Sequence, residues 1–152
     1  MSHAGMPIAW MIASNAQQET LTFFLQTVRA RNGNVKPNWI MSDKDHAQMN
    51  SIRLIYPESQ LLLCWWHVLH TWQQYFITLH HPELWSLLKA WDRITNQETF
   101  DRQWECIKAL APASVTQYLE TEWWAEQDLW SAVIWKDCSV LELSDTNMLV
   151  EA

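Results

Sequence analysis

The sequence contains only two glycines, Gly5 and Gly33, among its 152 residues. So few glycines exclude a collagen-like chain and any mechanism that depends on a glycine-rich phosphate-binding loop. Charged residues are also scarce, at 18%, whereas 49% of the residues are hydrophobic. This balance excludes a disordered chain, and the length suits one folded domain.

Basic residues are fewer than acidic ones, and the formal net charge is −7. A charge of this sign argues against a simple basic nucleic-acid-binding protein. The imbalance is uneven along the chain. Residues 1–80 contain five Lys and Arg against four Asp and Glu, whereas residues 81–152 contain five against thirteen. The two halves of the chain therefore differ chemically.

The three cysteines are too few, and odd in number, to form a disulfide framework, which favours a reducing intracellular compartment. Residues 59–82 contain no Asp, Glu, Lys or Arg and are numerous enough to span a bilayer. However, this stretch includes four His and three Gln, which a bilayer core would penalise. We therefore interpret it as protein interior and expect no membrane association.

The first 65 residues alternate between strand-like and helix-like segments. Helices of about a dozen residues between short apolar runs indicate βαβ units with a parallel or mixed sheet of about three strands. Gly33 suits the left-handed position that follows a helix. The predicted strands are Pro7–Ser14, Trp39–Ser42 and Gln60–Cys64, and the predicted helices are Gln17–Arg31 and Lys44–Tyr56.

From Trp66 onward the sequence predicts only helices, in an all-helical region over residues 66–143. Residues 66–79 are helical in composition, and Pro82 suits the first residue of a helix. Asn96 is a predicted N-cap, and Pro112 precedes another apolar helical pattern. Residues 144–152 read as a polar cap followed by the first turn of a further helix. The predicted fold class is thus an α/β segment followed by an all-helical region.

Asp43 is a candidate metal ligand because it follows the second predicted strand, and ligands bind at the carboxyl ends of strands in open α/β sheets. It could instead be the N-cap of the next helix. Asp45 competes for that role, because Gln48 follows it at capping-box spacing. A carboxylate not used as a cap could bind a hard cation such as Mg²⁺. The spacing alone leaves both interpretations open.

Cys64 and His67 form a Cys-x-x-His pair, and His70 follows one helical turn later. A zinc site is conceivable, but no second ligand pair has standard spacing. The default interpretation is a packed histidine. The twelve tryptophans are expected mainly in the core, although some could stack on nucleobases. Glu151 alone reads as a solvated surface residue.

Four short motifs in this order resemble the transposase domain of Mutator-like elements (MULE), particularly the versions found in fungi. That family has a ribonuclease-H-like core with an acidic DDE triad. It also has a helical insertion between the second and third acids and a Cys-x-x-His motif after the second acid. The motifs are Ile40-Met41-Ser42-Asp43, Tyr56-Pro57-Glu58-Ser59, Leu63-Cys64-Trp65-Trp66-His67 and Thr146-Asn147-Met148-Leu149-Val150-Glu151.

The resemblance implies a role for each matching residue. Asp43 and Glu151 match the second and third catalytic acids, which in the family hold two Mg²⁺ or Mn²⁺ ions for phosphoryl transfer. Cys64 and His67 match the Cys-x-x-His pair, which we expect to shape the site near the scissile phosphate. The implied partner is DNA at transposon ends, the implied compartment is the nucleus, and a homo-oligomer is compatible with the family.

The sequence also departs from the family pattern. No residue before Pro7 can supply the first acid, and Met148 replaces the usual second Asn of the last motif. We therefore expect a partial transposase domain over residues 1–152, truncated at both ends and inactive alone. Two alternatives stay open. One is a domesticated, non-catalytic module that binds DNA or protein, and the other is a small zinc-binding α/β protein.

Overall fold

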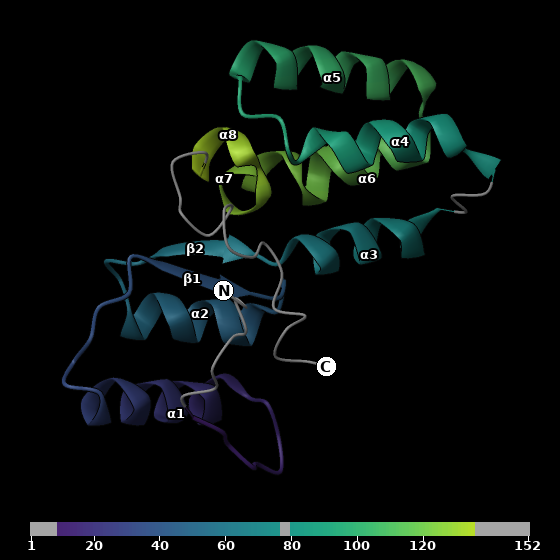
Figure 1. Ribbon diagram of the computed structural model, residues 1–152. Coiled ribbons are helices and arrows are strands. Elements are labelled where there is room, and N and C mark those ends of the chain that lie inside the picture. Colours follow the sequence, from purple (N-terminus) through teal and green to yellow (C-terminus); the bar gives the residue numbers. More distant parts are fainter. Residues whose placement is uncertain (1–8, 77–79, 136–152) are drawn as a thin grey trace, which may run out of the picture. The chain divides into compact units, whose positions relative to one another are not determined.

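The computed structural model describes residues 9–76 and 80–135, which form a mixed α/β structure that is mostly helical (Figure 1). The chain divides into two compact units after Cys64. The described part of the first unit is residues 9–64. The described part of the second is residues 65–76 and 80–135.

The first unit contains a βαβ motif preceded by a helix. Helix α1 (Gln18–Arg31) leads to strand β1 (Trp39–Ser42), and helix α2 (His46–Ile55) connects β1 to strand β2 (Gln60–Leu63). The two strands are parallel, with Trp39 opposite Gln60 and Ser42 opposite Leu63. Both helices, both strands and the parallel pairing were predicted from the sequence, and the structure confirms them.

The first predicted strand, Pro7–Ser14, is wrong for the residues that the structure describes. Residues 9–14 form no strand, and β1 and β2 are the whole sheet within the described residues; residues 7 and 8 lie outside that part of the chain. Trp10 and Ile12 explain the error, because their relative exposures are 79% and 103%. An apolar run predicts a buried strand only where a neighbouring strand supplies hydrogen bonds and a core covers the side chains.

Local signals set the ends of the elements in this unit. The Asp45 carboxylate accepts a 2.8 Å hydrogen bond from the backbone N–H of Gln48, which caps the N-terminus of α2. Gly33 has a φ of 66° just after α1, the left-handed conformation predicted for it. The core of the unit lies between α2 and the sheet, where Met49, Ile52 and Leu62 are buried.

The second unit is helical throughout its described residues. Pro82 begins α4 and the Asn96 side chain caps α5 by accepting from the N–H of Thr99, as the sequence predicted. Within the described residues, no helix is both long and apolar enough to cross a membrane. The helices are α3 (Trp65–Tyr75), α4 (Pro82–Trp91), α5 (Gln97–Leu110), α6 (Ala113–Glu122), η2 (Trp124–Glu126), α7 (Gln127–Trp130) and α8 (Ala132–Trp135).

Aromatic rings form the core of the second unit, where five of the tryptophans that were expected mainly in the core are buried: Trp72, Trp91, Trp104, Trp123 and Trp130. Trp91 is fully buried, stacks on Trp104 at 5.0 Å with an interplanar angle of 8°, and meets Trp130 edge-on at 4.9 Å. Aromatic pairs at these distances add to the free energy gained by burying apolar area. The rings that contact Trp91 are Trp72, Phe100, Trp104, Trp124 and Trp130.

Candidate functional site

Asp43 and Cys64 follow the two parallel strands at the same edge of the sheet. Asp43 comes directly after β1, and Cys64 comes directly after β2. The register places the last residues of the strands, Ser42 and Leu63, opposite each other. The N–H of Cys64 continues the ladder by donating a 2.9 Å hydrogen bond to the carbonyl oxygen of Ser42. The structure therefore brings these two predicted site residues together.

Asp43 does not cap the helix that follows it. Asp45 accepts the hydrogen bond from Gln48 and has the extended backbone of an N-cap residue. The Ser42 hydroxyl donates a 2.9 Å hydrogen bond to the carbonyl oxygen of Asp43, which holds the backbone where the strand ends. The sequence left two interpretations open for Asp43, a metal ligand and the N-cap of α2. The structure excludes the N-cap.

Cys64 is fully buried, with a relative exposure of 0%. The residues before it, Leu61–Leu63, are also buried. Its thiol is therefore shielded from solvent. A buried side chain of this kind is a poor candidate for a nucleophile that must reach a substrate.

His67 lies in the first turn of α3, in the second unit, so its position relative to Asp43 is not described. It is half-buried and meets the Trp66 ring edge-on at 4.8 Å. His70 is exposed, stacks on Trp66 at 4.8 Å with an interplanar angle of 9°, and lies 2.9 Å from the Gln74 amide nitrogen. These contacts occupy His70 with neighbours on its own helix.

Sequence reasoning missed a cation–π contact between Arg93 and Trp65, the first residue of α3. The Arg93 guanidinium lies over the Trp65 ring at 4.0 Å and 3.5 Å from the carboxylate of Asp92, which is fully buried. A cation over an aromatic face stabilises both groups. No local signal could have revealed this contact, because 28 residues separate Trp65 from Arg93.

Asp43 could serve as one ligand of a metal ion. It is half-buried, and a partly accessible carboxylate supplies the oxygen that Mg²⁺ prefers. Within residues 9–76 and 80–135, no three His, Cys, Asp or Glu side chains are grouped closely enough to hold a metal ion. The hypothesis of a zinc site at Cys64, His67 and His70 therefore gains no support. Glu151 lies outside the described residues.

Basic side chains in the first unit lie mainly at the opposite end of the sheet from Asp43. Arg29 and Arg31 are in the last turn of α1, and Arg53 is in the last turn of α2. Each of these helices ends just before a parallel strand begins, so these bases lie toward the amino ends of the strands. Lys44 is adjacent to Asp43 in the sequence.

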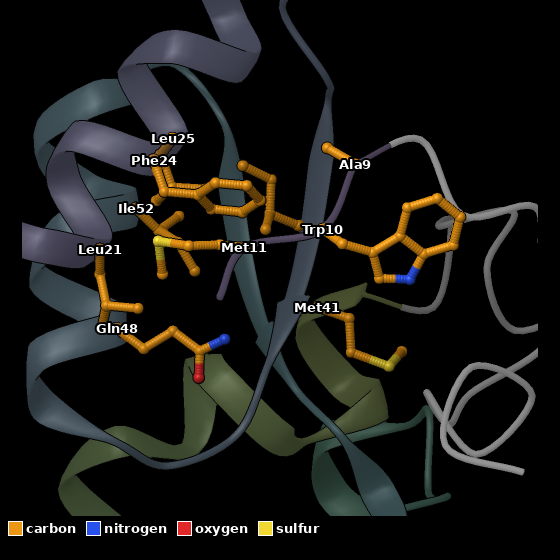
Figure 2. Close-up of a pocket in the computed structure, with 10 residues that line it drawn as sticks. Ala9, Trp10, Met11, Leu21, Phe24, Leu25, Met41, Gln48 and Ile52 are labelled. Carbon is orange, nitrogen blue, oxygen red and sulfur yellow. The ribbon is translucent and has the colours of Figure 1, made fainter. Parts of the chain in front are cut away.

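An apolar cavity of about 440 Å³ lies between α1, α2 and β1, and residues 9–11 line its remaining side (Figure 2). Met11 points toward Phe24 and Ile52, whereas the Trp10 indole points away from them. Gln48 is the one polar side chain of the lining, which includes neither Asp43 nor Cys64. With no titratable group, this cavity offers no acid–base chemistry.

Comparisons with known proteins support part of the sequence interpretation. The family model described as MULE transposase domain matches residues 2–71, a range that contains Asp43, Cys64 and His67. No curated protein and no solved structure matches the chain. The match over residues 2–71 confirms the resemblance to the MULE transposase domain that the sequence motifs indicated.

Proposed function

We propose that this chain is part of a DDE-type DNA transposase of the kind found in Mutator-like elements, with a ribonuclease-H-like core. In this proposal Asp43 is the second catalytic acid and Glu151 the third. The substrate is DNA at transposon ends, and the nucleus is the compartment in which the enzyme meets it. The match of residues 2–71 to the MULE transposase domain carries the proposal.

The position of Asp43 supports this role. It leaves the sheet at the carboxyl end of β1, and the adjacent β2 ends at the same edge with Cys64. The N-cap of α2 is Asp45 and not Asp43. Ligand sites in open α/β sheets lie at this edge, since loops from parallel strands converge there.

The residues have distinct proposed tasks. Asp43 holds a divalent cation through its carboxylate, and Cys64 keeps the edge in shape by packing beneath it. For His67, the proposal rests on its match to the family's Cys-x-x-His motif within residues 2–71. When bound, Mg²⁺ or Mn²⁺ supplies Lewis-acid activation of the attacking oxygen and stabilises the leaving oxygen.

A consequence of the proposal is that the 152 residues alone do not cleave DNA. Residues 1–42 contain a single acid, Glu19, which lies in the first turn of α1 and not on a strand. A two-metal site without its first acid loses ligands for both ions. Metal-dependent strand cleavage by the purified chain, abolished in Asp43→Ala, would overturn this part.

Manganese binding to the purified chain tests the role of Asp43. We expect added Mn²⁺ to broaden the NMR signals of backbone amides near the carboxyl edge, in residues 42–45 and at Cys64. Asp43→Asn should remove the broadening. Asp45→Asn is the matched control, because it removes a neighbouring charge while Asn caps a helix about as well as Asp.

Three outcomes separate the possibilities. Broadening that is lost in Asp43→Asn and kept in Asp45→Asn supports the proposed site. Broadening that persists in Asp43→Asn, or that depends equally on Asp45, contradicts it. Absence of broadening in the parent chain also contradicts the proposal that Asp43 holds a cation in this chain.

A further inference from the structure

The exposed face of α3 carries no charge. Trp66, His70, Gln73 and Gln74 are all exposed, and they recur at the i, i+4, i+7, i+8 spacing of one helical stripe. The opposite side of the helix buries Val68, Leu69 and Trp72 in the core of the second unit. We call the four exposed residues the α3 face.

The α3 face differs from the exposed faces of the other long helices in this unit. The described residues of the second unit contain four Lys and Arg against nine Asp and Glu. Each of α4, α5 and α6 exposes at least one glutamate, such as Glu83, Glu98 and Glu120. A polyanion that approaches this unit therefore meets less repulsion at the α3 face than at those helices.

Three side chains of the α3 face, those of Trp66, His70 and Gln74, contact one another before any ligand binds. The Trp66 and His70 rings are parallel at 4.8 Å, and the next turn continues the contact, with 2.9 Å between the His70 Nε2 and Gln74 Nε2 atoms. Side chains that are already ordered lose less conformational entropy on binding. Trp66 still keeps 38% of its surface exposed.

The chemistry of the face indicates what it binds. It contains no aliphatic side chain, so a hydrophobic groove of a protein partner would bury mainly polar groups here at a cost. A nucleobase offers a π face to an indole or imidazole ring. Its edge offers donors and acceptors to a glutamine amide.

We propose that the α3 face binds unpaired nucleobases of DNA, with Trp66 as the stacking platform and Gln73 and Gln74 as contacts to base edges. This inference rests on the proposed function, since it takes DNA as the substrate. It assigns a DNA-contact surface to the second unit, in addition to the metal ligand proposed at Asp43 in the first unit. Loss of stacking at Trp66 should weaken binding about tenfold, within the range of one base–aromatic stack.

The test measures binding of the purified full chain to a fluorescein-labelled single-stranded oligothymidylate by anisotropy, at about 50 mM salt because binding to DNA weakens with salt. We expect Trp66→Ala to raise Kd about tenfold and Trp66→Phe to restore much of the affinity, because Phe keeps a ring. Tyr75→Ala is the matched control, since it removes an exposed aromatic ring from α3 outside the α3 face.

A charge substitution tests the same surface independently. Gln73→Glu places a carboxylate on the α3 face and should weaken binding several-fold, whereas Gln117→Glu adds the same charge on the exposed surface of α6 and should leave Kd within twofold. Circular dichroism of each variant verifies that it folds like the parent chain.

The outcomes decide the proposal in either direction. Selective weakening in Trp66→Ala and Gln73→Glu supports it. Equal affinity of parent and Trp66→Ala, equal weakening in Gln117→Glu, or no binding by the parent overturns it. A change of oligomeric state in Trp66→Ala without a change in Kd overturns it in favour of a protein interface. Mn²⁺ broadening around Asp43 needs no DNA, so the metal proposal can fail or succeed separately.

Discussion

The backbone N–H of Cys64 donates a hydrogen bond to the carbonyl oxygen of Ser42, which extends the parallel ladder by one step beyond the two strands. This contact joins the residue before Asp43 to the first residue of the Cys-x-x-His pair. Two motifs that are 21 residues apart in the sequence thereby share one sheet edge. The side chain of Cys64 is fully buried.

The two described cysteines should differ sharply in thiol reactivity. Cys64 is fully buried, whereas Cys106 is exposed on α5. In a Cys138→Ser background, we expect Ellman's reagent to modify one thiol rapidly in the folded protein and a second one only after unfolding. Cys106→Ser should abolish the rapid phase. A rapid phase that survives this substitution would show that Cys64 is accessible.

Asp45 should contribute measurably to the stability of the first unit. Asp45→Ala leaves the N–H of Gln48 without its side-chain acceptor and should lower the free energy of unfolding by about 1 kcal/mol, as expected for a lost N-cap. Urea denaturation monitored by far-UV circular dichroism measures the change. Asp45→Asn is the control and should stay within a few tenths of a kcal/mol. Equal losses in both variants would argue against capping.

Trp91 should be among the least replaceable residues of the second unit. Its ring is fully buried and contacts five other aromatic rings, so Trp91→Ala opens a large cavity and should cost about 3–5 kcal/mol. Urea denaturation gives the value, and Trp91→Phe should cost less. Trp66→Ala, at an exposed position, should change stability by only about 0.5 kcal/mol. A similar cost at both positions would contradict the packing described for Trp91.

The ion pair between Lys36 and Glu58 should be visible as a change in acid titration. The 2.9 Å hydrogen bond from the Lys36 ammonium, followed by its positive charge, lowers the pKa of the exposed Glu58 carboxyl below its ordinary value. A lowered folded-state pKa means that the pair stabilises the protein above the unfolded-state pKa. This stabilisation is lost as the pH falls through the folded-state pKa.

NMR titration of the Glu58 side-chain carbon checks this expectation. Lys36→Met should raise the pKa of Glu58 toward the ordinary value of a glutamate. Lys44→Met, which removes a lysine elsewhere in the first unit, is the control and should leave the titration unchanged. An unchanged pKa of Glu58 in Lys36→Met would mean that the pair does not persist in solution.

Much of the fold could be predicted from sequence because its signals are local. The strand Trp39–Ser42 was predicted with its observed bounds, and Asn96 was identified as a cap from its place before a helical pattern. The capping-box spacing to Gln48 identified Asp45 as a competing cap, and the structure decided between Asp45 and Asp43. Each of these features depends on residues within about one turn.

Features that depend on distant partners could not be predicted. The run Pro7–Ser14 has strand-like composition, but composition does not reveal whether a neighbouring strand and a covering core exist, and residues 9–14 form no strand. The expectation of core tryptophans did not reveal which rings surround Trp91. The contact of Arg93 with Trp65 likewise forms only in the folded unit, because Trp65 begins α3 and Arg93 follows the end of α4.

The uneven distribution of tryptophan means that the second unit dominates the fluorescence and the near-ultraviolet absorbance of the protein. Of the twelve indoles, the described residues 9–64 contain only Trp10 and Trp39, whereas ten lie in residues 65–135. Intrinsic fluorescence and near-ultraviolet absorbance will therefore follow the aromatic core around Trp91 and report little about the sheet edge of Asp43. A binding event at that edge could leave the emission spectrum nearly unchanged, so spectral silence would be no sign that a cation is absent.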